Sequence, residues 1–386
     1  MNKRVIAFLT VLNVLVYLPL IPAQAKVKAG ASCKKVGITS IASNKTFTCI
    51  KSGKKLVWNN GRTNSTFSWN GDKQPSSSPE IVVPVSWPID KAADQNIFLI
   101  ADKNFRKFQQ TNTNVPKLTI NYGPTADKKR ADEYLFSLYK AAKFWNSDWK
   151  FDQDIVVALG TSKDYTWMSQ YWSNYGLTGS WFDSSESTYT QLGANCNHGS
   201  AIFGNSRPFF WGCLPTQGDL NFIGLKKFSA HEYTHLAQYG IMGNLGLMQM
   251  PTLISEGSAD FYGLSLASDE KNIDSDWKTY FSRGFISDSS REYLMKANSI
   301  QITDLLIDSF AKGSKVEGHW YYTGAYVTIR LIAAQGHDGF VRFMKLVAET
   351  SNANQSFEKV YGMKFDDFAK VIAPEIQKLS STITSR

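Results

Sequence analysis

The chain has 386 residues, of which 43% are hydrophobic and 13% aromatic, so it can bury a sizeable core. This length indicates two domains or one large bilobed domain. The formal net charge is +9, but lysine and arginine are scattered along the chain and form no stripe, so we expect no nucleic-acid partner.

Residues 1–25 have the three parts of a secretory signal peptide. Lys3 and Arg4 form a basic start, residues 5–21 an apolar run, and residues 23–25 a small-residue cleavage site. An uncleaved anchor is the alternative, but the run is short for a membrane span. We therefore expect a secreted or cell-surface protein with no transmembrane helix in the mature chain. Its charge falls to +7 without Lys3 and Arg4, and such a surface can hold it on anionic wall polymers.

Residues 26–72 predict a small β module, because short β-prone segments alternate with Gly, Asn and Lys. A disulfide between Cys33 and Cys49 would stabilise so small a unit. The run Gly-Lys-Lys-Leu-Val-Trp at residues 53–58 resembles modules at the start of exported actinobacterial proteins. The aromatic residues Trp58 and Trp69 either pack its core or contact cell-wall polymer.

The four cysteines form two local pairs in the sequence, Cys33 with Cys49 and Cys196 with Cys213. An even number in an exported chain predicts disulfides. Three connectivities are available, and the local one closes the shortest loops. Metal binding by these cysteines is disfavoured, because the sequence contains no Cys-x-x-Cys.

Residues 73–90 form a predicted linker, rich in Pro and Ser at its start. Residues 91–386 then predict one α+β domain, in which strands come first and helices follow. The predicted elements before residue 224 are strands at 117–124 and 154–160, a helix over 126–145, and a hairpin or edge strand over 200–213. Beyond residue 224 the sequence is mostly helical.

Residues 228–239, FSAHEYTHLAQY, contain two histidines four residues apart. On an α-helix these positions stand one turn apart on one face, so His231 and His235 project together with Glu232 beside them. We expect this helix to end near Gly240. Two imidazoles at this spacing can bind one metal ion while the glutamate reaches a water on it. A pair of core histidines is the alternative.

Residues 251–263, PTLISEGSADFYG, predict a second helix that opens at Pro251. Glu256 is the candidate for the third protein ligand that catalytic zinc usually takes. The small residues after it let this helix approach the first one. Asp260 lies one turn further on, where it can accept the free ring N–H of a ligating histidine and orient the ring. A solvated helix carboxylate is the alternative for Glu256.

The two-part motif, His231-Glu232-x-x-His235 and then Glu256-Gly-x-Ala-Asp260, resembles the gluzincin zinc metallopeptidases over about residues 115–380. The resemblance implies a zincin-like bilobed domain with a sheet-containing N-terminal lobe and a helical C-terminal lobe. It also implies one Zn²⁺ per chain on His231, His235 and Glu256, and hydrolysis of peptide bonds in a peptide or protein substrate.

Departures from related families narrow the resemblance. Metzincins need Gly and His where this chain has Gln238 and Ile241, and a zincin with an aspartate ligand would use Asp260 instead of Glu256. The Gly-x-Met-Glu-Asn signature of gluzincin aminopeptidases is absent. An endopeptidase of the peptidase MA-like group is therefore the closer match.

Peptide hydrolysis at such a site needs a general base and an oxyanion donor. Glu232 is the candidate base, taking a proton from water and passing it to the leaving amine. In aminopeptidase-like gluzincins a tyrosine three residues before a glycine stabilises the oxyanion, and here the matching pair is Tyr321 and Gly324. His319 is the second candidate. The remaining histidines, 198 and 337, are expected to be structural.

The sequence leaves the substrate and two further functions open. Residues 199–211 either pair with an extended peptide as an edge strand or form an ordinary hairpin. A catalytically silent cell-wall-associated binding protein would need no Glu232. A zinc hydrolase that cleaves a non-peptide amide, such as a wall cross-link, would use the same site.

Overall fold

The computed structural model describes residues 27–36, 39–42, 45–60, 62–63, 87–109, 116–149, 151, 153–175, 196, 198–204, 207–217, 223–283, 288–311, 316 and 318–383. The chain divides into two compact units, Met1–Thr63 and Asn64–Arg386. The predicted signal peptide, Trp69 and most of the predicted linker lie outside the described residues. The predicted boundary at residue 72 lies there too and stays a prediction.

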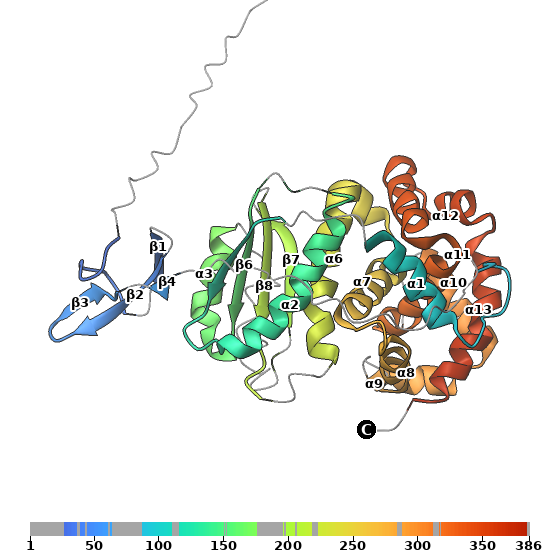
Figure 1. The fold of residues 1–386 in the computed structure, drawn as a ribbon, viewed down its shortest axis with the longest axis horizontal. Helices are drawn as coiled ribbons and strands as arrows, with labels where there is room; N and C mark the ends of the chain where they lie inside the picture. The colour runs from blue at the N-terminus through green and yellow to red at the C-terminus, as the bar shows by residue number, and fades with distance from the viewer. Residues whose placement is uncertain are drawn as a thin grey trace, which may run out of the picture. The chain divides into compact units, whose positions relative to one another are not determined.

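In the small unit, three short strands pair with a longer one, all antiparallel (Figure 1, blue). The strands are β1 (Thr39–Ala42), β2 (Lys45–Ser52), β3 (Lys55–Trp58) and β4 (Arg62–Thr63), of which β2 pairs with the other three. Gly53 makes the tight turn between β2 and β3 with a φ of 61°, which glycine adopts without steric cost. The predicted Cys33–Cys49 disulfide is present, and Cys49 is fully buried. Trp58 is half-buried.

The larger unit contains a four-stranded mixed sheet in the order β5-β6-β8-β7 (Figure 1). Its strands are β5 (Leu118–Tyr122), β6 (Ile155–Gly160), β7 (His198–Gly204) and β8 (Arg207–Cys213). β5, β6 and β8 are parallel, and β7 runs antiparallel to β8 at the edge. The predicted hairpin therefore has one edge strand, β7, while β8 is internal. The predicted Cys196–Cys213 disulfide joins the segment before β7 to the end of β8.

The helix predicted over residues 126–145 is present as α2 (Lys128–Trp145), which packs beside the sheet (Figure 1). The Asp127 side chain caps its first turn by accepting the N–H of Arg130 at 2.9 Å. Further along, η1 (Ser162–Asp164) and α3 (Tyr165–Asn174) follow β6.

Helices make up most of the rest of the larger unit, so the α+β class predicted from the sequence is confirmed. They are α1 (Ile97–Gln109), α6 (Ile223–Gln249), α7 (Thr252–Ala267), α8 (Ile273–Arg283), α9 (Asp288–Lys296), α10 (Ser299–Ala311), α11 (His319–Thr350), α12 (Ala353–Tyr361) and α13 (Phe365–Ser380).

The order along the chain is not simply strands and then helices. α1 precedes every strand of the sheet but lies among the C-terminal helices (Figure 1). The N–H of Trp87 and the side-chain amide of Asn104 both donate to the carbonyl of Ala333, each at 2.9 Å. Trp87 lies within the predicted linker, so the last residues of that linker, like α1 after it, are packed into the helical half.

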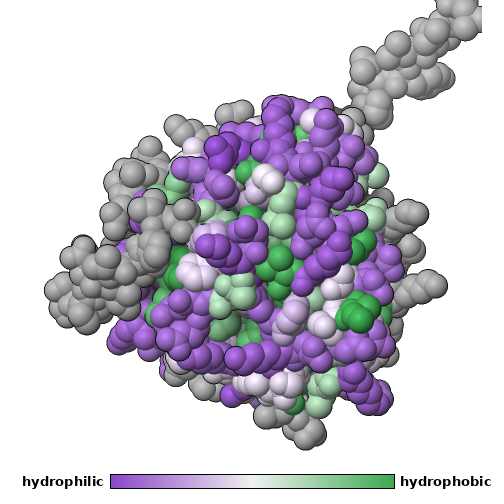
Figure 2. Space-filling model, turned by 90° about the vertical axis from the view of Figure 1, so that its right-hand side faces the viewer, coloured by the Kyte–Doolittle hydropathy of each residue, from purple (hydrophilic) through white to green (hydrophobic). Residues whose placement is uncertain are grey.

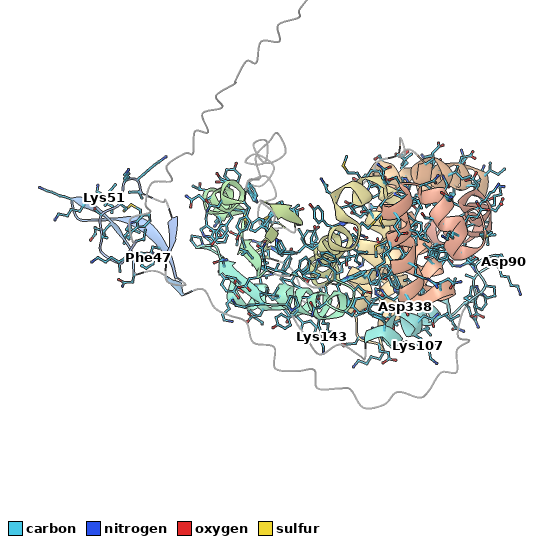
Figure 3. All side chains as sticks on the ribbon, turned by 90° about the horizontal axis from the view of Figure 1, so that it is seen from above. Phe47, Lys51, Asp90, Lys107, Lys143 and Asp338 are labelled. Atoms are coloured by element: carbon cyan, nitrogen blue, oxygen red, sulfur yellow. A yellow bond between two sulfur atoms is a disulfide. The ribbon has the colours of Figure 1, made fainter. Side chains whose placement is uncertain are left out.

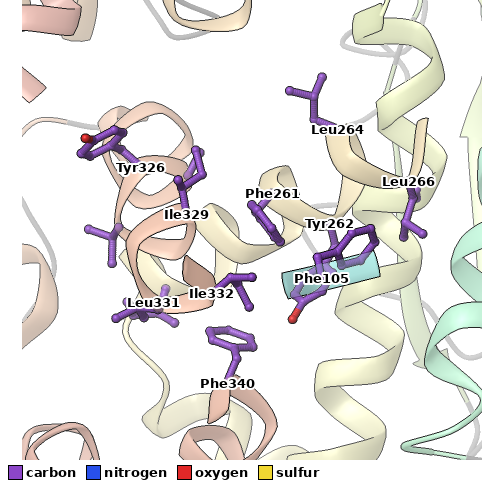
Figure 4. Close-up of a cluster of buried hydrophobic side chains, with 14 of the residues drawn as sticks. Phe105, Phe261, Tyr262, Leu264, Leu266, Tyr326, Ile329, Leu331, Ile332 and Phe340 are labelled. Atoms are coloured by element: carbon purple, nitrogen blue, oxygen red, sulfur yellow. The ribbon is translucent and has the colours of Figure 1, made fainter. Parts of the chain in front are cut away.

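Aromatic and aliphatic side chains from α1, α7 and α11 form the centre of the core (Figure 4). The rings of Phe105 and Phe261 meet edge to face with centroids 5.9 Å apart, and Phe340 packs near Tyr262 with centroids 6.0 Å apart. Each fully buried aromatic ring stabilises the fold by about 2–3 kcal/mol. This core fixes the position of α7, which carries two of the predicted site residues.

The helix that carries the two histidines ends near Gly240, as the sequence predicts. Gly240 itself is helical; the backbone leaves helical geometry at Gly243, where φ is 68°, and a second helical stretch continues to Gln249. A side chain at Gly240 would collide with the ring of Trp149. Gly240 is therefore explained by packing and not by termination of the helix.

Close approach of α7 to its two neighbours depends on glycines. A Cβ on Gly257 would overlap the backbone of Gly324 in α11, and a Cβ on Gly263 would lie 2.9 Å from the carbonyl oxygen of Lys227 in α6. Gly257, the small residue after Glu256, therefore allows α11 to approach α7. The sequence interpretation assigned it to the approach of α6, but the glycine that lies against α6 is Gly263.

Hydrophilic residues predominate on the face drawn in Figure 2, with hydrophobic residues interspersed. Among the described residues, no helix is both long and apolar enough to span a membrane. The two disulfides are compatible with an extracellular location, because disulfides persist in oxidising compartments.

We expect Gly257→Val to destabilise the larger unit by about 2–3 kcal/mol, because the new side chain forces α7 and α11 apart. Urea denaturation followed by circular dichroism measures this change. Thr252→Val, an exposed position on the same helix, is the matched control and should change stability by less than about 0.5 kcal/mol. Equal stability of the two variants would contradict the packing argument.

Candidate metal centre

One turn of α6 presents both histidines on the same face. The Nε2 atoms of His231 and His235 lie 3.3 Å apart, and their rings meet edge to face. The segment is helical because apolar residues such as Tyr233, Leu236 and Ala237 occupy its fully buried side. The i, i+4 geometry expected from the sequence is present.

α7 brings Glu256 to the same point. Its Oε2 lies 3.4 Å from the Nε2 of His231 and 3.4 Å from the Nε2 of His235. The three donor atoms therefore form a nearly equilateral triangle. Ligands about 2.0–2.1 Å from a tetrahedral ion are about 3.4 Å from one another, so His231, His235 and Glu256 have the spacing of three corners around one ion.

Asp260 orients His231 from the far side of the ring, as predicted. Its Oδ1 accepts from the Nδ1 of His231 at 2.6 Å, which leaves Nε2 free for a metal. Lys227 forms an ion pair with the same oxygen, and the hydroxyl of Tyr280 donates to the other. Both carboxylate oxygens of this fully buried residue are thus engaged.

His235 is oriented by an amide instead of a carboxylate. Its Nδ1 lies 2.9 Å from the Oε1 of Gln238. The Gln238 amide nitrogen donates to the carbonyl of Ser255 and to the hydroxyl of Ser258, both at 2.9 Å. Gln238 therefore links the histidine helix to the glutamate helix.

Sequence reasoning missed three of these supporting residues. Gln238 and Lys227 stand three positions after His235 and four before His231, so helical spacing could have indicated both. Tyr280 lies on α8, and no local pattern connects it to the site.

Negative charge surrounds the two imidazoles. Burial disfavours the charged form of His231, but the neighbouring carboxylates, Asp260 first, outweigh it and raise its pKa to about 10. Burial also works against ionised Glu256, yet the two histidines hold its pKa well below the usual range. Three carboxylates (Glu232, Glu256 and Asp260) and one ammonium group leave a formal charge of −2 when the imidazoles are neutral. A divalent cation would balance this charge.

Glu232 lies next to the triad without joining it. Its Oε1 is 4.0 Å from the Nε2 of His231, and the residue is buried. Burial, assisted by the charge of Glu256, raises the pKa of Glu232 above its ordinary value. A carboxylate with a raised pKa beside a metal triad is suited to accept and return a proton near neutral pH.

Of the two oxyanion candidates, only Tyr321 lies by the triad. Its ring centroid is 6.0 Å from that of His231, and its backbone carbonyl accepts from the hydroxyl of Tyr280 at 2.8 Å. Burial, with the charges of Glu256 and Asp260, raises the pKa of Tyr321, so its hydroxyl stays protonated and can donate.

His319 is not available as a donor, which corrects the sequence interpretation. The residue is fully buried, and its two ring nitrogens lie 2.7 Å from the hydroxyl of Ser309 and 2.8 Å from that of Thr323. His319 and Tyr321 are two residues apart on α11, so they project about 200° from each other. They cannot both face the triad.

His337 has the structural surroundings expected for it. Its nitrogens lie 2.7 Å from the hydroxyl of Tyr262 and 3.0 Å from a carboxylate oxygen of Asp148, and it is buried. The side chain of His198 lies outside the described parts of the structure. Tyr322, beside the predicted donor, is buried with its ring against Phe281.

No protein-family model, curated protein or solved structure matches this chain. The assignment of the site therefore depends on its own geometry. Within the described residues, His231, His235 and Glu256 are the one group of three or more potential metal-ligating side chains that come together.

Removing the carboxylate behind His231 should weaken metal binding. We expect Asp260→Asn to lower the affinity for Zn²⁺ about 10- to 100-fold, because the ring loses its charged acceptor. Competition with a chromogenic chelator measures the dissociation constant. Asp274→Asn, a partly exposed carboxylate on α8 that pairs with Lys278, is the control; equal affinity in both variants would contradict the role of Asp260.

The buried state of His319 predicts a pH effect on stability. Burial lowers its pKa to about 4, so between pH 6.5 and 4 the folded chain binds fewer protons at this ring than the unfolded chain does. Stability therefore falls as the pH falls through this window, by about 2–3 kcal/mol from this group.

In His319→Gln this contribution is absent, so urea midpoints at pH 7 and pH 4.5 should differ less than in the wild-type protein. Ser309→Ala removes the hydrogen bond but keeps the titrating ring, and it should retain the wild-type pH dependence. An unchanged pH dependence in His319→Gln would show that this ring does not titrate as described.

Proposed function

We propose that this protein is an exported zinc-dependent metallopeptidase that hydrolyses peptide bonds. The observation that carries the proposal is the triangle of donor atoms, 3.3–3.4 Å on each side, formed by two imidazoles and one carboxylate. Glu232 lies at its edge, where a structural metal site would need no further carboxylate.

Zinc is the metal that this donor set favours. Two histidines and one glutamate form a recurrent catalytic zinc set, which leaves one coordination position open. When bound, Zn²⁺ supplies a Lewis acid that lowers the pKa of water towards 7 and polarises a carbonyl group. Hard cations such as Mg²⁺ prefer oxygen ligands, so the two imidazoles argue against them.

Side chains of the protein provide proton transfer, oxyanion stabilisation and orientation of the metal-binding imidazoles. Glu232 accepts a proton from the attacking water and later delivers it to the leaving amine. Tyr321 donates a hydrogen bond to the developing oxyanion from the start of α11. Asp260 and Gln238 hold the two imidazoles in the tautomer that directs Nε2 at the metal.

The proposal extends to the family and its fold. The spacing of the two motifs resembles gluzincins, and the larger unit joins a mixed sheet to a set of helices, with the metal helix α6 packed against both β7 and α7. This arrangement supports a zincin-like bilobed peptidase domain. Among the described residues, no feature of the site selects an exopeptidase.

An extended peptide is the substrate that the sheet edge fits. β7 pairs only with β8 among the described strands, so its other side offers backbone donors and acceptors. The position of a Cβ on Gly199 is 3.2 Å from the ring of Phe228, which stacks on His231 with centroids 6.4 Å apart. The first residues of β7 therefore lie beside the metal-binding turn of α6.

The direct test compares the wild-type protein with Glu232→Gln on a mixed peptide library. We expect one zinc per chain in both proteins, and at least about a 100-fold loss of cleavage in the variant, because only the proton-transfer group has changed. Elemental analysis measures zinc, and mass spectrometry of the library measures cleavage.

Tyr321→Phe, measured in the same assay, should lower kcat with little change in KM. Glu292→Gln, an exposed carboxylate on α9, is the matched control and should cleave normally. Zinc without cleavage by the wild-type protein would contradict the proposal and favour a silent binding protein.

A further inference from the structure

The net positive charge of this protein comes from its small unit. All 33 acidic residues follow residue 63, and the first of them is Asp72. Of the 42 lysines and arginines, 11 precede residue 64 and 31 follow it, so the larger unit has a formal charge of −2. Residues 27–63 alone carry eight basic residues and no acidic one. The basic residues are scattered over both units, as expected, but the acidic residues that balance them are all in the larger unit.

These basic residues face solvent without acidic partners. The side chains whose burial is described are all exposed, namely Lys28, Lys34, Lys35, Lys51, Lys54 and Lys55. Because the unit contains no Asp or Glu, none of these ammonium groups can be neutralised within it. Eight like charges on so small a unit repel one another, and this repulsion is relieved when a polyanion binds.

Five of the lysines gather at one end of the strands, and we call them the hairpin-end lysines: Lys34, Lys35, Lys51, Lys54 and Lys55. Three of them flank the Gly53 turn between β2 and β3. The N–H of Cys33 donates to the carbonyl of Leu56 at 3.1 Å, which brings the other two beside the same turn. Figure 3 marks Lys51 in this part of the unit and Phe47 further back along β2, where Phe47 is buried.

Basic residues also lie at the opposite end of β2. Lys45 begins that strand, and Arg62 pairs with Thr46. The eight residues of β2 span about 23 Å. A flexible chain that follows the strand can contact the basic residues at both of its ends.

We propose that the small unit binds a flexible, phosphate-bearing polyanion of the cell envelope. Seven of its eight basic residues are lysines, whose compact ammonium groups bind phosphate as point charges and require no fixed geometry. Among the side chains of the unit whose burial is described, two large apolar ones are exposed, Val36 and Ile50, which are too few for insertion into a membrane. The larger unit, with its formal charge of −2, adds no net positive charge to this attraction.

The test uses the whole mature chain, from Lys26, and two variants with equal net charge. In one, the five hairpin-end lysines are changed to Gln. In the other, five exposed lysines of the larger unit are changed to Gln: Lys117, Lys128, Lys278, Lys296 and Lys370. The probes are poly(glycerol phosphate), polyglutamate, and vesicles that contain phosphatidylglycerol, each at several salt concentrations.

We expect the wild-type protein to bind poly(glycerol phosphate) more tightly than the other two probes at 0.15 M salt. The hairpin-end variant should lose at least about tenfold in affinity and show a shallower dependence on salt, because fewer counterions are released. The control variant should stay within about twofold of the wild-type protein. A free-thiol titration checks that both disulfides remain in each variant.

Three results would overturn the proposal. Equal losses in the two variants would show that net charge matters and the small unit does not. Tighter binding to polyglutamate or to vesicles would assign a carboxylate polymer or a membrane as the partner. Absence of binding to any probe at 0.15 M salt would mean that the unit binds no polyanion. The binding test measures neither peptide cleavage nor zinc content. Its failure is therefore distinguishable from failure of the proposed peptidase activity.

Discussion

The candidate metal centre depends on the close approach of α7 to α6. Glu256 reaches both imidazoles because the backbone of α7 at Gly263 lies directly against α6. A larger residue at this position would meet the carbonyl of Lys227. On its other side α7 meets α11 backbone to backbone at Gly257 and Gly324. This double constraint places one carboxylate from α7 in contact with α6 while α11 carries Tyr321 towards the same point.

Local periodicity made the centre of the site predictable, and tertiary contacts hid the rest. Helical spacing alone aligns His231 with His235, and the short distance in sequence to Glu256 leaves few ways for the two helices to pack. By contrast, Tyr280 contacts Asp260 from a different helix, α8. Asn104 of α1 bonds to Ala333 of α11, which is 229 residues away in the sequence. Such contacts leave no periodic signal in the sequence.

Two details that the sequence did not reveal have the same physical origin. The histidine helix ends near Gly240, as predicted, but the break is at Gly243, and Gly240 makes room for Trp149. His319 was grouped with Tyr321 by proximity in sequence, although helix geometry turns the two side chains to different faces. A glycine can end a helix or make room for a neighbour, and a histidine can serve a site or the core. The residues that surround each one in space determine which role it has.

X-ray absorption at the zinc edge of the zinc-loaded protein tests the central claim most directly. The account predicts two imidazole nitrogens and oxygen ligands, all about 2.0–2.1 Å from the metal, and no sulfur. In Glu256→Gln the two imidazole signals should remain while the oxygen shell changes. A zinc ion with sulfur ligands, or with one imidazole or none, would contradict convergence of α6 and α7 on a single ion.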